Sequence, residues 1–109
     1  MYRKESEVLN QCLDFLQLNN IFCWRNNTGA LKVNGRFVRF GYTGSPDIIG
    51  ITKEGKFLGV ECKREKGGVL SEAQKNFQKE CKIRGGVYIV ANSLETLVSE
   101  LKKYHVIGE

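Results

Sequence analysis

Apolar side chains recur at helical spacing near the start of the chain, between residues 4 and 18, and predict an amphipathic helix with one buried stripe. The apolar positions of this stripe are Val8, Leu9, Cys12, Leu13, Phe15 and Leu16. Residues 21–25 form a short aromatic run that indicates a strand. Asn34-Gly35 separates two further runs, 30–33 and 36–40, and predicts a hairpin because both residues tolerate the positive φ of a tight turn.

The second half of the chain alternates strand and helix patterns. Strands are expected over residues 47–52 and 56–63, joined by the three-residue loop Lys53-Glu54-Gly55. A helix over 71–84 begins with the capping-box pattern Ser71-x-x-Gln74 and ends before two glycines. An apolar strand over 87–91, buried on both faces, and a last helix after Ser93 complete the pattern. Two strands joined by a helical crossover pair in parallel, so we expect an α/β fold with a mixed sheet.

Length and composition indicate one soluble domain over residues 1–109. The chain is 41% hydrophobic and 27% charged, and it has no apolar run long enough to span a bilayer. Its charged start has no apolar signal core behind it, so we expect a cytoplasmic protein of a bacterial or phage-infected cell, with no membrane partner. The four cysteines are scattered, which favours reduced buried thiols over disulfides or a zinc site. A single histidine leaves no His-based triad.

The net charge of +5 favours polyanionic partners, nucleic acid first among them. A basic surface that serves only solubility is equally consistent with charge alone.

The register of the predicted hairpin over 47–63 brings acidic residues together. If Glu54 is the centre of the turn, Asp47 lies opposite Glu61 on one face of the ladder. Lys63 follows two residues later on the same face, whereas Cys62 points into the core. A two-residue turn would instead place Asp47 opposite Cys62 and separate the carboxylates.

Two directly opposed carboxylates repel each other unless a cation neutralises them. Hard oxygen ligands suit Mg²⁺ or Mn²⁺. Such a metal polarises a phosphoryl oxygen and lowers the pKa of a bound water, and a nearby lysine orients that water or stabilises developing charge. Together with such a metal, Asp47, Glu61 and Lys63 would supply the groups needed for phosphodiester hydrolysis. On the residues alone, a solvated surface cluster is an open alternative.

Three motifs in order resemble the PD-(D/E)XK nucleases, and more closely their VRR-NUC branch, the virus-type replication-repair nucleases. They are Gly44-Ser45-Pro46-Asp47, Val60-Glu61-Cys62-Lys63 and Leu70-Ser71-x-x-Gln74. Weaker outer matches are Glu7, Arg25-Asn26-x-Thr28-Gly29 and residues 85–90. The resemblance covers nearly the whole chain and implies a restriction-endonuclease-like core, a central mixed β-sheet flanked by helices.

The resemblance also implies roles for individual residues. Asp47, Glu61 and the main-chain carbonyl of Cys62 would bind Mg²⁺ or Mn²⁺, and Lys63 would be the catalytic lysine. Gln74 would order the site or contact the phosphate while also capping its helix. Glu7 would complete the metal site, or serve only as a solvated acid favoured by the dipole of the first helix.

Basic residues on loops and on the first hairpin, together with Asn26, are the expected contacts to nucleic acid. The expected set is Arg25, Asn26, Lys32, Arg36, Arg39, Arg64 and Lys66. A stripe of Lys75, Lys79 and Lys82 is expected to be the solvated face of its helix. Trp24, Phe37 and Tyr42 are expected in the core rather than stacked on bases. No recognition helix is evident, so contacts to phosphates would bind DNA without reading its sequence.

These observations favour a metal-dependent DNA endonuclease. Without an appended domain, selection of a DNA structure would need a second subunit, so the analogy favours a Holliday-junction-resolvase-like homodimer acting on branched DNA. A flap or duplex nuclease of the same chemistry is an alternative. A non-catalytic nucleic-acid-binding module, or a structural partner protein whose acidic pair is neutralised by Lys63, are the alternatives from other classes.

Overall fold

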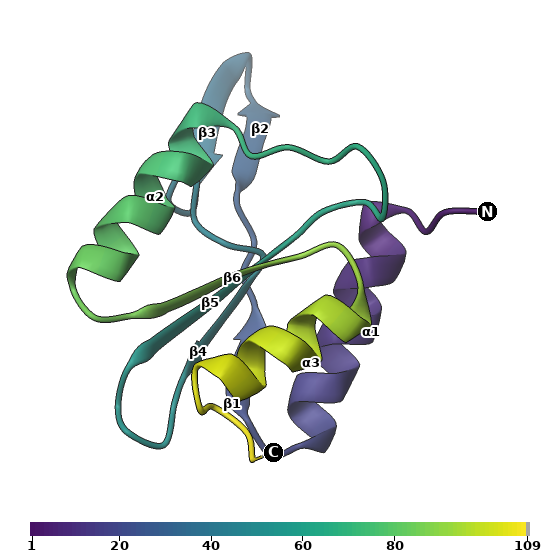
Figure 1. Cartoon of the computed structure of the whole chain (residues 1–109). Coiled ribbons are helices and arrows are strands. Elements are labelled where there is room, and N and C mark those ends of the chain that lie inside the picture. Colours follow the sequence, from purple (N-terminus) through teal and green to yellow (C-terminus); the bar gives the residue numbers. More distant parts are fainter. Residues whose placement is uncertain (109) are drawn as a thin grey trace.

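A four-stranded mixed sheet forms the centre of the fold and carries helices on both faces (Figure 1). The computed structural model describes residues 1–108. Within them, no helix is both long enough and apolar enough to cross a membrane. The elements are α1 (Glu5–Leu18), β1 (Phe22–Arg25), β2 (Gly29–Val33), β3 (Arg36–Phe40), β4 (Ile48–Ile51), β5 (Phe57–Cys62), α2 (Glu72–Ile83), β6 (Val87–Ala91) and α3 (Leu94–Lys103).

The strands lie in the order β1-β4-β5-β6, with β4 antiparallel to both β1 and β5 and with β5 parallel to β6. The expected α/β fold with a mixed sheet and a parallel crossover through α2 is therefore confirmed. Ile48 pairs with Val60 and Ile51 pairs with Phe57, which is the register expected for a turn centred on Glu54. Gly55 completes this turn at φ 82°, a backbone conformation that glycine adopts without strain.

The hydrophobic core lies between the sheet and the helices α1 and α3. Val8, Cys12 and Leu16 of α1 are fully buried there, as the helical stripe predicts. Alternate residues of β5 face them, including the fully buried Cys62. β6 lies at the edge of the sheet but is still nearly all buried, because α2 and α3 both contact it.

The helix α2 covers the opposite face of the sheet only in part. Cys81 is buried there, whereas Ala73 and Phe77, which the helical pattern also places inward, are half-buried. The four cysteines are free; Cys23 is half-buried and the other three are buried, in agreement with the expectation of reduced thiols.

The hairpin β2–β3 forms a separate two-stranded sheet that projects away from the central one (Figure 1). Its turn residues Asn34 and Gly35 have φ of 50° and 77°, as the sequence predicts for a tight hairpin turn. Every residue of both strands is exposed. The pairing register gives the hairpin two different faces. One carries Leu31, Val33, Val38 and Phe40 with Arg36, and the other carries Ala30, Lys32, Phe37 and Arg39.

The expectation that Trp24, Phe37 and Tyr42 lie in the core is wrong. Their exposed fractions are 44%, 78% and 72%. Phe37 lies on the projecting hairpin, which packs on no core. Trp24 lies on the edge strand β1, and Tyr42 lies on the loop before β4, where its ring meets the edge of Phe77. The aromatic character of these residues does not show that α2 covers only part of the sheet face on which it packs.

Candidate active site

Asp47 is held from two sides at the start of β4. Its carbonyl oxygen accepts a hydrogen bond from the backbone N–H of Asn26 at 2.7 Å, which extends the β1–β4 ladder by one residue. Its carboxylate oxygen Oδ2 accepts a hydrogen bond from the backbone N–H of Cys62 at 2.8 Å. The side chain of Asp47 therefore points across to β5 and is only partly exposed.

The register of β4 with β5 places Glu61 opposite Asp47. Glu61 is almost completely buried, with 2% of its surface exposed. Its Oε1 accepts a hydrogen bond from Gln74 Nε2 at 2.7 Å. Its Oε2 is buried and receives no hydrogen bond from any described residue. The Asp47 side chain lies near enough for its negative charge to act on the Glu61 carboxyl group.

The pKa of Glu61 is raised from its ordinary value of 4.5 to about 8, with burial as the largest cause. The negative charge of Asp47 contributes to this rise, while the ammonium group of Lys63 acts in the opposite direction. Without a cation, Glu61 is therefore stable as a neutral acid near pH 7, and a cation would favour its ionised form.

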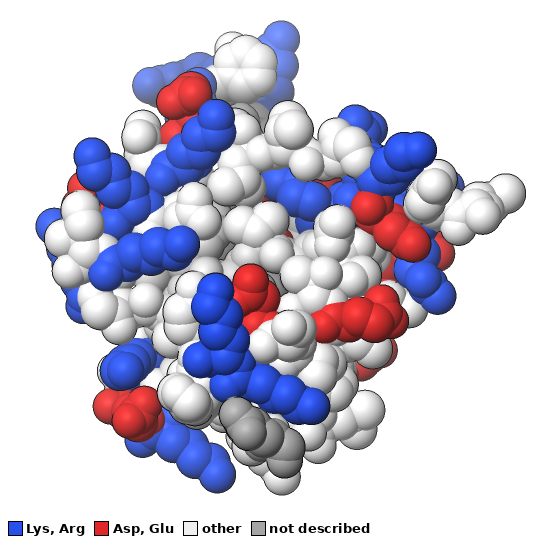
Figure 2. All heavy atoms as spheres, viewed as in Figure 1, with Lys and Arg blue, Asp and Glu red and all other residues white. Residues whose placement is uncertain are grey.

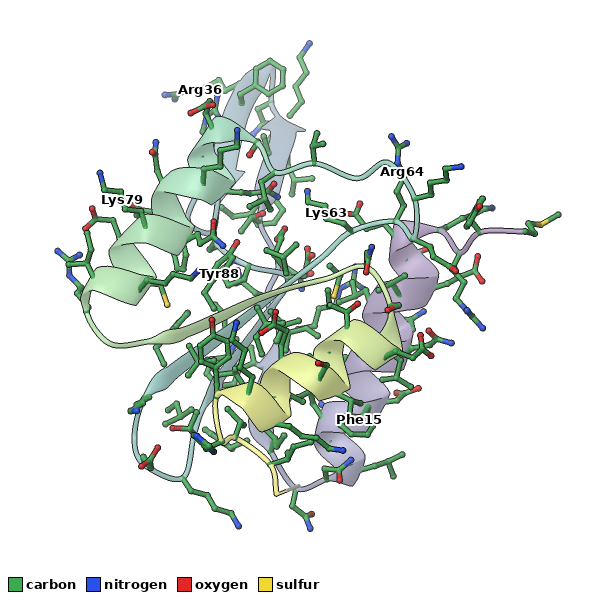
Figure 3. All side chains as sticks on the ribbon, in the orientation of Figure 1. Phe15, Arg36, Lys63, Arg64, Lys79 and Tyr88 are labelled. Carbon is green, nitrogen blue, oxygen red and sulfur yellow. The ribbon has the colours of Figure 1, made fainter. Side chains whose placement is uncertain are left out.

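Lys63 and Gln74 complete a connected polar cluster with Glu61. The Nζ of Lys63 donates a hydrogen bond to Gln74 Oε1 at 2.9 Å, and only 14% of the lysine side chain is exposed. Figure 3 shows Lys63 just beyond the end of β5, between the N-terminal ends of α1 and α2. Gln74 also caps α2, because its Oε1 accepts from the N–H of Ser71 at 2.9 Å while Ser71 Oγ accepts from the N–H of Gln74 at 3.2 Å. Gln74 therefore contacts both Glu61 and Lys63 while it caps the helix.

The acid of α1 that approaches this cluster is Glu5. Its Oε1 lies 4.0 Å from Lys63 Nζ, and its charge contributes to the raised pKa of Glu61. Glu7 is exposed, and its Oε1 accepts from the N–H of Lys4 at 3.4 Å at the start of the helix. The sequence contains a signal that favours Glu5 over Glu7 at this place. Glu5 lies three and four residues before Val8 and Leu9, which belong to the inward stripe of the helix.

The donor set fits a small divalent cation. Among residues 1–108, no three His, Cys, Asp or Glu side chains are grouped so that they could hold a metal ion. The β4–β5 register brings two acidic side chains together here, Asp47 and Glu61. Mg²⁺ commonly takes one or two carboxylates and keeps several waters. The buried Glu61 Oε2 has no donor within the described part of the chain and lies near a second carboxyl group, an arrangement that a cation would satisfy.

The expected DNA-binding cations are all exposed, and they lie on three segments. Arg25 ends β1; Lys32, Arg36 and Arg39 lie on the hairpin; and Arg64 and Lys66 follow Lys63. Figure 2 shows Lys and Arg side chains on the projecting hairpin and over α2. Arg64 donates to the carbonyl of Gly67, and the Nζ of Lys66 lies 5.0 Å from the ring centre of Tyr2. The stripe of Lys75, Lys79 and Lys82 is exposed as expected, and Lys79 points away from the sheet (Figure 3).

The raised pKa of Glu61 predicts how the stability of the metal-free protein depends on pH. Between about pH 4.5 and pH 8 the folded state keeps a proton that the unfolded state releases, so folding stability falls as pH rises through this window. Thermal unfolding in EDTA should therefore show a larger fall in Tm between pH 5.5 and pH 8 for the wild type than for Glu61→Gln, which stays neutral. Glu95→Gln, at an exposed position in α3, serves as the control and should follow the wild type. Identical pH profiles for the wild type and Glu61→Gln would contradict the assignment.

Comparison with known proteins identifies the family to which the chain belongs. The family model for the VRR-NUC domain matches residues 3–95 of the 109-residue chain. The match includes every site residue described above. The comparison with curated proteins gave no match, and the comparison with solved structures gave none. The family is one of nucleases with a PD-(D/E)XK-like fold, which generally use divalent metals and act on DNA. The chain belongs to the VRR-NUC family.

Proposed function

We propose that this protein is a metal-dependent DNA endonuclease whose active site is the cluster of Asp47, Glu61, Lys63 and Gln74. In this proposal Asp47, Glu61 and the main-chain carbonyl of Cys62 bind Mg²⁺ or Mn²⁺. One observation carries the proposal: Glu61 Oε2 is buried beside a second carboxyl group and receives no hydrogen bond from residues 1–108. Such an arrangement is costly in a protein that has no use for a cation at this point.

When bound, the metal would supply Lewis-acid polarisation of the scissile phosphate and a water of lowered pKa. The chain's own residues would supply orientation and charge. Gln74 fixes the ammonium group of Lys63 at the edge of the acidic pair. From there Lys63 would orient the attacking water or stabilise the charge that develops on the phosphoryl oxygens. Glu5 lies beside the same lysine and would help to keep it in place.

DNA would approach along the exposed cations on the hairpin and around residues 64–66. Lys32 and Arg39 share one face of the hairpin with Phe37, so they present charge to the same side. Contacts of this kind go to phosphates, so affinity should fall steeply with salt and show little sequence preference.

The preferred substrate in this proposal is branched DNA, cut by a Holliday-junction-resolvase-like homodimer. Support for a second subunit comes from the apolar face of the hairpin, where Leu31, Val33, Val38 and Phe40 are each between 41% and 59% exposed. Exposed apolar side chains on one face are typical of a contact with another protein. A two-fold axis would present two active sites for paired cuts.

We also propose that the protein works in a reducing compartment, the cytoplasm of a bacterial or phage-infected cell. The free state of all four cysteines supports this location.

A cleavage assay tests the proposed activity. The labelled substrates are a four-way junction, a flap and plain duplex DNA, each incubated with Mg²⁺, Mn²⁺ or EDTA. Asp47→Asn keeps an acceptor for the N–H of Cys62 but removes the charge, and Lys63→Met keeps the alkyl chain but removes the ammonium group. Both should reduce the cleavage rate by about 100-fold or more while DNA binding persists. Glu95→Gln is the control and should cut like the wild type.

The pattern of products separates the alternatives. Paired symmetric cuts in the junction support the resolvase, and cleavage of flap or duplex alone would overturn that substrate while keeping the chemistry. DNA binding without cleavage in either metal would contradict the nuclease and favour a non-catalytic binding module. Full activity of Asp47→Asn would contradict the site.

The proposed dimer is tested by measuring the molar mass in solution. Light scattering after size-exclusion chromatography should give about twice the 12.4 kDa of one chain. Leu31→Lys places a charge on the apolar face and should shift the protein toward monomer, whereas Ala30→Lys, on the opposite face of the same strand, should not. A wild type that is monomeric at every concentration, or a Leu31→Lys variant that dimerises equally well, would count against this interface.

A further inference from the structure

Asn26 lies directly opposite Asp47 at the end of the β1–β4 ladder. The last regular pair is Arg25 with Ile48, and the next step places Asn26 beside Asp47. The backbone N–H of Asn26 donates to the carbonyl of Asp47 at 2.7 Å. This bond fixes the main chain of Asp47 on its β1 side.

The side chain of Asn26 holds the two residues that precede Asp47. Its Nδ2 donates to Ser45 Oγ at 2.7 Å and to the carbonyl of Pro46 at 3.0 Å. An asparagine amide has two N–H donors, and both are therefore used within the chain. Asn26 keeps no free side-chain donor for a phosphate and is half-buried, whereas the basic residues predicted to contact DNA are exposed.

The segment that Asn26 holds has little secondary structure of its own. It runs from Gly41 to Pro46, and Gly41 and Gly44 have φ of 75° and 87°, conformations that other residues rarely adopt. Gly44 also packs so closely on α2 that an added Cβ would lie 2.4 Å from the carbonyl oxygen of Ala73. The Pro46 carbonyl belongs to the peptide that leads into Asp47, so a rotation of that peptide would turn the Asp47 carboxylate away from Glu61.

We propose that Asn26 is a positioning residue of the active site, which aims the carboxylate of Asp47 by clamping Ser45 and Pro46. This inference rests on the proposed nuclease function and adds a residue that acts through Asp47 rather than on DNA. Outer contacts of this kind orient the ligands of a metal, and small displacements of a reacting group slow catalysis strongly.

Asn26→Ala tests the clamp. We expect single-turnover cleavage to slow by about 10- to 100-fold and the affinity for Mn²⁺, measured calorimetrically without DNA, to weaken by about 10-fold. The Kd for DNA should stay within about twofold, because no phosphate contact is lost. Asn27→Ala is the matched control: Asn27 is the exposed neighbour, its side chain makes no hydrogen bond to the described residues, and the variant should behave as wild type.

Ser45→Ala provides a second, milder variant and a double-mutant cycle. It removes one acceptor and leaves the bond to the Pro46 carbonyl, so we expect a smaller loss of rate than for Asn26→Ala. The double variant should be no slower than Asn26→Ala alone, because both changes act on one contact. Additive losses of cleavage rate in the double variant would overturn the proposed clamp. If Asn26→Ala does not fold, Ser45→Ala still tests the clamp.

The remaining outcomes separate this inference from the proposed function. Weaker DNA binding by Asn26→Ala with an unchanged single-turnover rate would make Asn26 a DNA contact and overturn the positioning role. A lower Tm with wild-type rate and wild-type Mn²⁺ affinity would make its role purely structural. Unchanged kinetics in every variant of a cleaving enzyme overturns the inference alone, whereas a wild type that never cleaves DNA overturns the proposed function itself.

Discussion

The pairing of β4 with β5 is the constraint on which the site depends. Its register places Asp47 opposite Glu61 and forces two carboxyl groups together in a largely buried position. The folded chain satisfies this arrangement only in part. Asp47 accepts a hydrogen bond from the N–H of Cys62, and Glu61 accepts one from the amide of Gln74. One buried oxygen of Glu61 has no donor among the described residues, and the pKa of the Glu61 carboxyl group is raised to about 8. This arrangement lowers the folding stability of the metal-free protein, and a cation bound between the two carboxyl groups would restore that stability.

The sheet and α2 are joined through the same residues that form the site. Gln74 caps α2, accepts from Lys63 and donates to Glu61, so the start of the helix and the end of β5 are fixed to each other. A single amide in three contacts leaves few alternative rotamers for its partners. The polar cluster is therefore held in place by hydrogen bonds within the chain itself.

Much of this arrangement was predictable, because local rules determine it. The glycine at the end of the three-residue loop sets the register, and the register brings Asp47 and Glu61 together. Sequence patterns did not reveal which faces of the elements are covered. Exposure of Trp24 and Phe37 follows from the incomplete cover of α2 and from a hairpin that packs on no core, both of which are tertiary features. The approach of Glu5 to Lys63 depends likewise on how α1 docks on the sheet.

Calorimetric titration of Mn²⁺ into the DNA-free protein shows whether Asp47 and Glu61 form a cation site, and it needs no assumption about the substrate. We expect the wild type to bind Mn²⁺ saturably, and we expect the Mn²⁺ affinity of both Asp47→Asn and Glu61→Gln to be about 10-fold or more weaker. Absence of Mn²⁺ binding by the wild type, or wild-type affinity in both variants, would contradict the claim that this pair of carboxyl groups forms a cation site.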